Sequence, residues 1–350
     1  MQTIKTLSDF FRESHTRYRI YDMGRGIRKL SVEEFEQFES GKQPYPYPLQ
    51  QHAWLAILGW NEQNKAEQFI WFLKFPLDET ARLIQATRDD FMTHLLQSVG
   101  HNIQAAREGS ELQDGLNESP YGFKPKESTM AAFHAKALFS LGQPPSRFYD
   151  HARDYFAGGP GYEQWAFVGI QGIADVAARL DEQDNLEQVL KALPELPPPA
   201  LIALCGFLEN EVIPTALAEA LQRRLEVALN EKTPDFQVIA ALLRAFSQSK
   251  GKGLREAALQ QALASQHKHD INILAAIAAR NWEALTNEHL AHDYVEALAA
   301  NNLGQDAFTQ IMADLLYIPG MRPSLLAQLR NPERSQTLSK AVGAMFNTQL

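Results

Sequence analysis

From residue 128 onward, apolar segments of helix length alternate with short breaks at Pro, Gly, Asn or Asp. Apolar residues recur within these segments every three or four positions, which is the spacing of an amphipathic helix. Short connections make successive helices antiparallel neighbours. The pattern predicts an all-α region, with helices at 129–141, 146–156, 162–179, 185–193, 198–210, 214–229, 235–247, 253–266, 270–279, 306–317, 323–330 and 333–346.

Several of these segments, such as "ALIALCGFL" and "INILAAIAA", are apolar on broad faces. Helices of this kind need cover on two sides, which stacked helix pairs provide. The pairs recur at about 35–45 residues, the range of HEAT-like repeats. We therefore predict a HEAT-like, irregular α-solenoid over 128–350, with a compact helical bundle as the alternative.

The first 75 residues have a different composition, because they contain 14 of the 34 aromatic residues. Aromatic and β-branched residues favour strands. "RYRIYD" (17–22) and "IRKL" (27–30) predict a hairpin, and "AWLAIL" (53–58) and "QFIWFLKF" (68–75) predict two more strands.

Ser31 and Glu34 have the spacing of a capping box at the start of a short helix. Further helices are expected at 2–14 and 76–105. The prediction is an α+β module with a small antiparallel sheet over 1–108, a polar linker over 109–127 and the helical domain over 128–350.

The stretch "FPLDETARL" (75–83) holds two adjacent carboxylates, Asp78 and Glu79, directly after Pro76. Neighbouring residues on a helix point about 100° apart, so these two cannot act as a facing acid/base pair. Proline at the first turn and acidic residues near the positive end of the helix dipole favour a helix start. Asp78 and Arg82 then have the i,i+4 spacing of an ion pair.

The tripeptide Leu77-Asp78-Glu79 after an aromatic strand, in a chain of this length, also resembles a bacterial protein family of unknown function noted for an LDE motif. The resemblance covers essentially the whole chain. It implies no activity and no catalytic residue, only that Asp78 and Glu79 matter.

The predicted N-terminal hairpin is basic. Residues 1–30 contain seven Lys and Arg against three Asp and Glu, whereas the whole chain has a net charge of −9. Arg17, Arg19, Arg25 and Arg28 could contact phosphate locally, although no RNA-recognition motif accompanies them.

Two further patterns have plain structural interpretations. "AGGPGYEQW" (157–165) lacks the Gly-Lys-Ser/Thr ending of a phosphate loop, so it predicts a glycine helix end followed by a new helix. His267 and His269, with His289 and His292, mimic a metal set. A helix of about ten residues separates the pairs by ~15 Å unless the chain doubles back, which favours solvated loop histidines.

The single cysteine, Cys205, excludes an intrachain disulfide, and the charged N-terminus does not have the apolar core of a signal peptide. We therefore expect a cytoplasmic protein without membrane association. No motif predicts a catalytic residue, a metal or a cofactor.

The leading hypothesis is a non-catalytic protein–protein interaction scaffold or adaptor. One alternative is an enzyme with an unfamiliar site between the two domains, and a second is a nucleic-acid-associated protein that uses the basic hairpin. The candidate interaction or structural residues are Asp78, Glu79, Arg82, Arg17, Arg19, Arg25 and Arg28.

Overall fold

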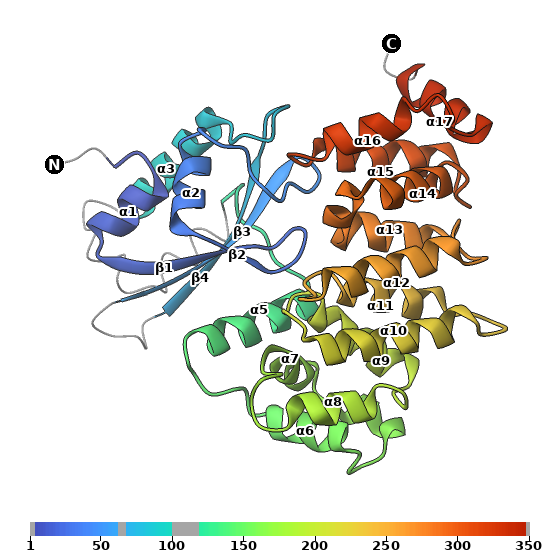
Figure 1. The fold of residues 1–350 in the computed structure, drawn as a ribbon. Coiled ribbons are helices and arrows are strands. Elements are labelled where there is room, and N and C mark those ends of the chain that lie inside the picture. Colours follow the sequence, from blue (N-terminus) through green and yellow to red (C-terminus); the bar gives the residue numbers. More distant parts are fainter. Residues whose placement is uncertain (1–3, 62–67, 100–118, 348–350) are drawn as a thin grey trace. The chain divides into compact units, whose positions relative to one another are not determined.

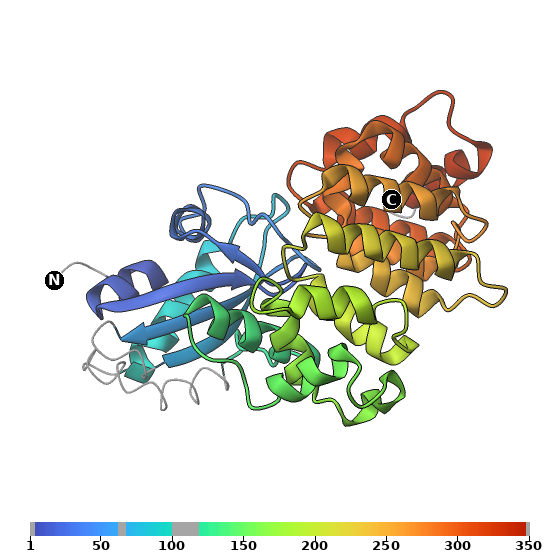
Figure 2. The same cartoon turned by 60° about the horizontal axis from the view of Figure 1, so that its bottom comes forward.

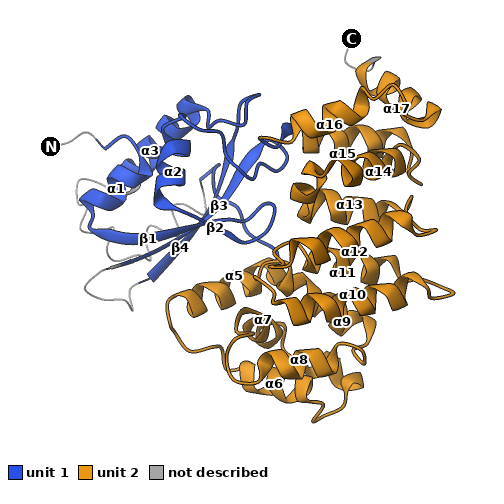
Figure 3. Cartoon of the chain, viewed as in Figure 1, with its two compact units in different colours: residues 1–126, 317–319 blue, residues 127–316, 320–350 orange. Residues whose placement is uncertain are grey.

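The computed structural model describes residues 4–61, 68–99 and 119–347. Within them the chain forms two compact units (Figures 1 and 3). The N-terminal unit comprises residues 1–126 together with Tyr317–Pro319, and the helical unit comprises 127–316 and 320–350. Most of the linker predicted at 109–127 lies outside the described residues.

The N-terminal unit is built on a four-stranded antiparallel sheet in the order β2-β1-β3-β4. Its strands are β1 (Thr16–Asp22), β2 (Arg28–Leu30), β3 (His52–Asn61) and β4 (Gln68–Pro76). The predicted hairpin and both later strands are confirmed. Gly26 supplies the left-handed backbone that the β1–β2 turn needs, with a φ of 135°.

Three helices cover one face of this sheet (Figures 1 and 2): α1 (Leu7–Glu13), α2 (Val32–Glu39) and α3 (Gln85–Val99). The capping box at the start of α2 is confirmed, because Ser31 and Glu34 exchange the expected hydrogen bonds. Alternate strand residues point toward the helices and join their aromatic side chains in one core, which includes Phe11, Phe38, Ile57, Trp71 and Phe91. Close ring pairs reinforce this core, such as Phe69 and Trp71 at 4.6 Å between centroids.

The helical unit contains the remaining helices of the described residues. They are α5 (Glu127–Ser140), α6 (Tyr149–Ala157), the 3₁₀ helix η2 (Tyr162–Phe167), α7 (Ile170–Ala178), α8 (Asn185–Ala192), α9 (Pro198–Leu208), α10 (Thr215–Leu229), α11 (Phe236–Ala245), α12 (Lys252–Ala264), α13 (Ile271–Arg280), the 3₁₀ helix η3 (Trp282–Thr286), α14 (Glu288–Ala299), α15 (Gln305–Tyr317), α16 (Arg322–Leu329) and α17 (Gln336–Asn347).

Alternate helices of this unit stack on one another (Figure 1). One row runs through α5, α7, α9, α11 and α13, and a second runs through α6, α8, α10, α12 and α14. Each helix is therefore covered by the next helix of its own row and by the facing row, which explains why α9 and α13 are apolar on broad faces. An α+β module followed by an all-α part is the fold class that the sequence predicted, and the HEAT-like repeat remains a prediction.

The helices of this unit differ from the prediction in two places. The single helix expected at 162–179 is η2 followed by α7, because the chain must turn where it passes α6. A Cβ at Gly172 would lie 2.3 Å from the Phe148 carbonyl oxygen, so only glycine permits this approach. Helix α14 was missed because "EHLAHD" looks polar. Its N-terminus is capped by Asn287, and Leu290, Tyr294 and Leu298 form its buried face.

Within the described residues, no helix combines the length and the apolar character that crossing a bilayer requires.

Candidate functional site

The LDE tripeptide lies in a tight loop, so the predicted helix start at Pro76 was wrong. Strand β4 continues through Pro76, Leu77 and Leu83 form an antiparallel bridge, and α3 begins only at Gln85. The Asp78 N–H donates to the Arg82 carbonyl oxygen at 2.9 Å, and Ala81 adopts a left-handed conformation with a φ of 60°. This segment is therefore a narrow hairpin-like loop and not the first turn of a helix.

The Asp78 side chain explains why the loop forms. Its Oδ1 accepts hydrogen bonds from the Thr80 N–H at 2.8 Å, the Thr80 hydroxyl at 2.8 Å and the Arg82 N–H at 2.9 Å. Short Asp side chains stabilise turns in this way, in competition with a helix. Burial acts to raise the pKa of Asp78, but these hydrogen bonds outweigh it and lower the pKa.

The three candidate residues of the loop, Asp78, Glu79 and Arg82, thus have different roles in its structure. The contact from Asp78 to Arg82 is made to the Arg82 backbone and not through the expected i,i+4 helical pair. Glu79 is exposed at the tip of the loop. The Tyr317 hydroxyl donates to the Asp78 carbonyl oxygen at 2.5 Å, so the main chain of Asp78 is held as well as its side chain.

The four arginines of the predicted basic hairpin have separate environments. Arg17 is exposed on β1, and the Arg19 guanidinium lies 5.4 Å from the centre of the Trp60 ring. Arg28 lies 5.3 Å from the Tyr47 ring. Arg25 is only 1% exposed, and its Nε donates to the Pro48 carbonyl oxygen at 2.6 Å. Arg17 is thus exposed, Arg19 and Arg28 are half-buried beside aromatic rings, and Arg25 is buried.

A buried acid at the end of β1, Asp22, was not anticipated from the sequence. Its Oδ1 accepts from the Tyr45 hydroxyl at 2.7 Å and from the Gly24 N–H at 3.2 Å, and its Oδ2 accepts from the Arg25 N–H at 2.9 Å. Burial raises the pKa of Asp22 to about 6, although these hydrogen bonds oppose the rise. In the sequence, the one sign of this arrangement is that an acidic residue stands directly before the turn sequence "MGRG". These bonds tie the β1–β2 turn to the segment around Tyr45.

The histidine interpretation needs two corrections. His289 and His292 lie in α14 and not in a loop, and the chain does double back, so that His269 and His292 line one cavity. Among the described residues, no group of three His, Cys, Asp or Glu side chains is arranged to hold a metal ion.

The glycine-rich stretch at 157–165 is confirmed as a helix end followed by a new helical turn. Gly158 ends α6 in the left-handed conformation, and η2 begins after Gly161. This turn leads into an exposed apolar surface, which we call the aromatic edge. It consists of Phe148, Trp165, Phe167 and Ile170, which are 40%, 38%, 76% and 37% exposed.

The members of the aromatic edge come from two segments that pack against each other. A Cβ on Gly169 would be 3.1 Å from the Phe148 ring, so the segment after η2 packs beside the start of α6. Arg147 extends over the same ring, with its guanidinium 4.9 Å from the ring centre. The edge is the largest concentration of exposed aromatic residues among the large apolar residues with described exposure.

A family model described as "Protein of unknown function (DUF3549)" matches residues 2–346. No curated protein and no solved structure matches the chain. The resemblance to a family of unknown function, expected from the sequence, is thus confirmed over nearly the whole length.

Proposed function

The chain belongs to this DUF3549 family, and we propose that it works as a non-catalytic interaction protein whose helical unit binds a protein partner. The observation that carries the proposal is the aromatic edge. Soluble proteins rarely expose aromatic side chains as a contiguous group unless the group binds something. Aromatic residues are also enriched among the side chains that contribute most to protein–protein binding.

The local structure supports a preformed surface. Phe148 lies at the start of α6 and Ile170 at the start of α7, so helices of the stacked rows hold the backbone that carries both side chains. Phe167, the most exposed of the four, ends η2. A rigid surface loses little conformational entropy on binding, which favours affinity.

Substitution of Phe167 tests the proposal. The wild-type full chain and Phe167→Asp are used as baits in the same lysate, and any candidate partner is then purified and titrated against both. We expect one partner that binds the wild type and loses at least about tenfold in affinity with Phe167→Asp, because a charge would be buried at the contact.

Val227→Asp is the matched control. Val227 is 57% exposed on α10, so the variant introduces the same charge at another exposed apolar position. It should bind the partner like the wild type. The proposal fails if no partner is recovered, if both variants bind equally, or if the edge mediates only self-association of this chain.

A second candidate function, nucleic-acid association, rests on the sheet. Lys74 Nζ lies 4.3 Å from the centre of the Trp54 ring, and Arg19 lies over Trp60. These pairs are on the face of β1, β3 and β4 that points away from the helix-covered core, together with Arg17. Cations interleaved with aromatic rings can bind single-stranded nucleic acid through phosphate contacts and base stacking.

Fluorescence anisotropy with a labelled single-stranded oligonucleotide tests this second candidate. Binding should weaken steeply as salt increases and should be lost in Arg17→Glu/Arg19→Glu. Lys5→Glu, which changes an exposed charge just before α1, on the helix-covered side of the sheet, should retain most of the affinity. Absence of binding at low salt, or equal loss in both variants, contradicts a nucleic-acid site on this face.

A further inference from the structure

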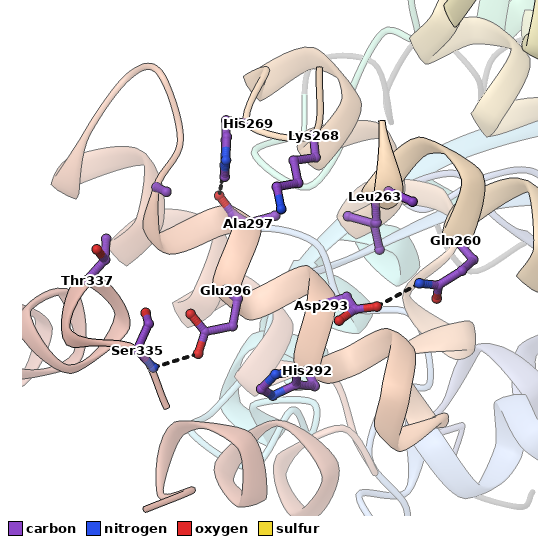
Figure 4. Close-up of a pocket in the computed structure, with 12 residues that line it drawn as sticks. Gln260, Leu263, Lys268, His269, His292, Asp293, Glu296, Ala297, Ser335 and Thr337 are labelled. Carbon is purple, nitrogen blue, oxygen red and sulfur yellow. Dashed lines mark hydrogen bonds between the residues drawn. The ribbon is translucent and has the colours of Figure 1, made fainter. Parts of the chain in front are cut away.

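A cavity of about 420 Å³ opens in the helical unit between α12, α14 and the start of α17 (Figure 4). Helix α14 forms its floor, with Asp293 and Glu296 one helical turn apart. The loop between α12 and α13 forms a wall and carries Lys268. The volume lies within the range of about 300–1,000 Å³ typical of small-molecule sites.

Both carboxylates on the floor are held by neutral donors. The Gln260 side-chain amide donates to Asp293 Oδ2 at 2.7 Å, and the Ser335 N–H donates to Glu296 Oε1 at 3.0 Å (Figure 4). Neither donor carries a positive charge. The two hydrogen bonds therefore fix the positions of the carboxylates and leave their negative charges uncompensated.

The cation of the cavity is placed on the opposite wall. In Figure 4 the Lys268 side chain extends from its loop toward α14. Within the described part of the chain, its ammonium is not in an ion pair with Asp293 or Glu296. The neighbouring His269 ring donates from Nδ1 to the Ala297 carbonyl oxygen at 3.2 Å, which anchors the loop to α14.

The cavity thus presents the Lys268 ammonium on one wall and the carboxylates of Asp293 and Glu296 on the floor. A ligand with complementary charges would carry one carboxylate and two cationic groups. We propose that this cavity binds a free basic α-amino acid of the arginine and lysine class. Lys268 receives the ligand's carboxylate. Asp293 and Glu296 receive the α-ammonium and the cationic side chain, because residues three apart on a helix present neighbouring side chains.

Calorimetric titration of the full chain with three probes tests the proposal. The probes are L-arginine, agmatine, which lacks the carboxylate, and L-citrulline, which lacks the side-chain charge. We expect arginine to bind at least about tenfold more tightly than either analogue, since a hydrogen bond to a charged group contributes about that factor.

Two variants assign the contacts. Lys268→Met should weaken arginine binding about tenfold and leave agmatine binding unchanged, because only arginine offers a carboxylate. Glu296→Gln should weaken both ligands and still accept the bond from Ser335. Lys252→Met, which removes another exposed lysine at the start of α12, is the matched control and should bind like the wild type.

These outcomes distinguish specific binding of arginine in the cavity from nonspecific electrostatic attraction to the protein. The proposal is overturned if arginine does not bind at millimolar concentration, if agmatine binds the wild type equally well, or if Lys268→Met and Lys252→Met behave alike. Phe167→Asp should leave arginine binding unchanged, so the result does not depend on whether the aromatic edge binds a protein.

Discussion

The two units bury their acidic groups in different ways. In the N-terminal unit, Asp22 and Glu39 accept hydrogen bonds from neutral groups: Asp22 from Tyr45 and two backbone N–H groups, and Glu39 from Ser8. In the helical unit, buried acids pair with arginines. Asp175 lies 3.3 Å from Arg179, and Glu209 bridges two arginines from later helices.

The difference reflects how each fold brings distant residues together. A sheet unit with a tight turn offers unpaired backbone N–H groups, and Asp22 satisfies those of the β1–β2 turn. The stacked rows instead bring side chains of successive helices together. Hydrogen bonds between these helices join residues that are far apart in the sequence. Arg153 and Asn185 are 32 residues apart, and Asn281 and Leu243 are 38 residues apart. The HEAT-like repeat itself remains a prediction.

The first test of the comparison is Asp175→Ala, which has the largest expected effect. Asp175 and Arg179 are 0% and 1% exposed, so the variant leaves a buried guanidinium with only the more distant carboxylate of Glu182, at 3.6 Å. Removing one partner of a buried pair costs about 3–5 kcal/mol. Chemical denaturation followed by far-UV circular dichroism measures the loss.

The double variant Asp175→Leu/Arg179→Met is the control, because it removes both charges and keeps apolar volume in place. It should be more stable than Asp175→Ala. Equal stability of the two variants would indicate that the unpaired charge is not the cause. The distinction between charge-paired and neutral-donor acids would then lose its physical basis.

The second test concerns pH and the N-terminal unit. Burial raises the pKa of Asp22 from 3.8 to about 6 in the folded chain, against the hydrogen bonds from Tyr45 and the turn. A raised folded pKa means that the group's contribution to stability is fully present below the unfolded pKa and is lost as the pH rises through 6. A shift of about two units corresponds to a loss of roughly 3 kcal/mol.

Asp22→Asn removes this titration. The difference in unfolding free energy between wild type and variant should therefore change by roughly 3 kcal/mol from about pH 4 to about pH 7, in the direction that disfavours the wild type at the higher pH. Tryptophan fluorescence follows the unfolding, since Trp54, Trp60 and Trp71 are in the sheet. A pH-independent difference would show that Asp22 titrates normally.

Sequence patterns predicted regular elements well wherever burial is periodic, as in β4, whose residues alternate between buried and half-buried positions. They failed where one side chain decides between two local structures. Asp78 after Pro76 has the residues of a helix start, but its hydrogen bonds to Thr80 and Arg82 close a loop instead. That choice depends on the Leu77–Leu83 bridge, which a pattern of residue types does not encode.

The candidate sites were predicted less well than the fold, for a similar reason. Arg25 has the same charge as Arg17, yet it is buried against Pro48 whereas Arg17 is exposed. The aromatic edge depends on Gly172 permitting close approach to α6. The cavity on α14 depends on the chain doubling back between His269 and His292. Such juxtapositions follow from packing and not from spacing in the sequence.

A third test examines the ion pairs that link helices along one row of the helical unit. Glu209 accepts from Arg244 Nε at 3.0 Å and from Arg280 Nε at 2.8 Å, which links the ends of α9, α11 and α13. Because the side chains of Arg244 and Arg280 are 28% and 21% exposed, Glu209→Gln should cost about 1–2 kcal/mol, less than the loss at Asp175. Hydrogen exchange should increase across all three helices, whereas Asp293→Asn, on α14, should leave them protected. An increase confined to α9 would argue against coupling along the row.

The smallest expected effect is at the LDE loop, Leu77-Asp78-Glu79. Asp78→Ala removes the side-chain acceptor of Thr80 and Arg82 and should cost about 1 kcal/mol, as loss of a capping side chain does. Hydrogen bonds lower the pKa of Asp78, so its contribution is present at neutral pH and decreases as the pH falls through the folded pKa, opposite in sign to that of Asp22. Glu79→Ala, at the exposed tip, is the matched control and should change stability little. If Asp78→Ala keeps its stability but abolishes binding of the partner that Phe167→Asp also loses, the loop itself takes part in binding and its structural role is not its main one.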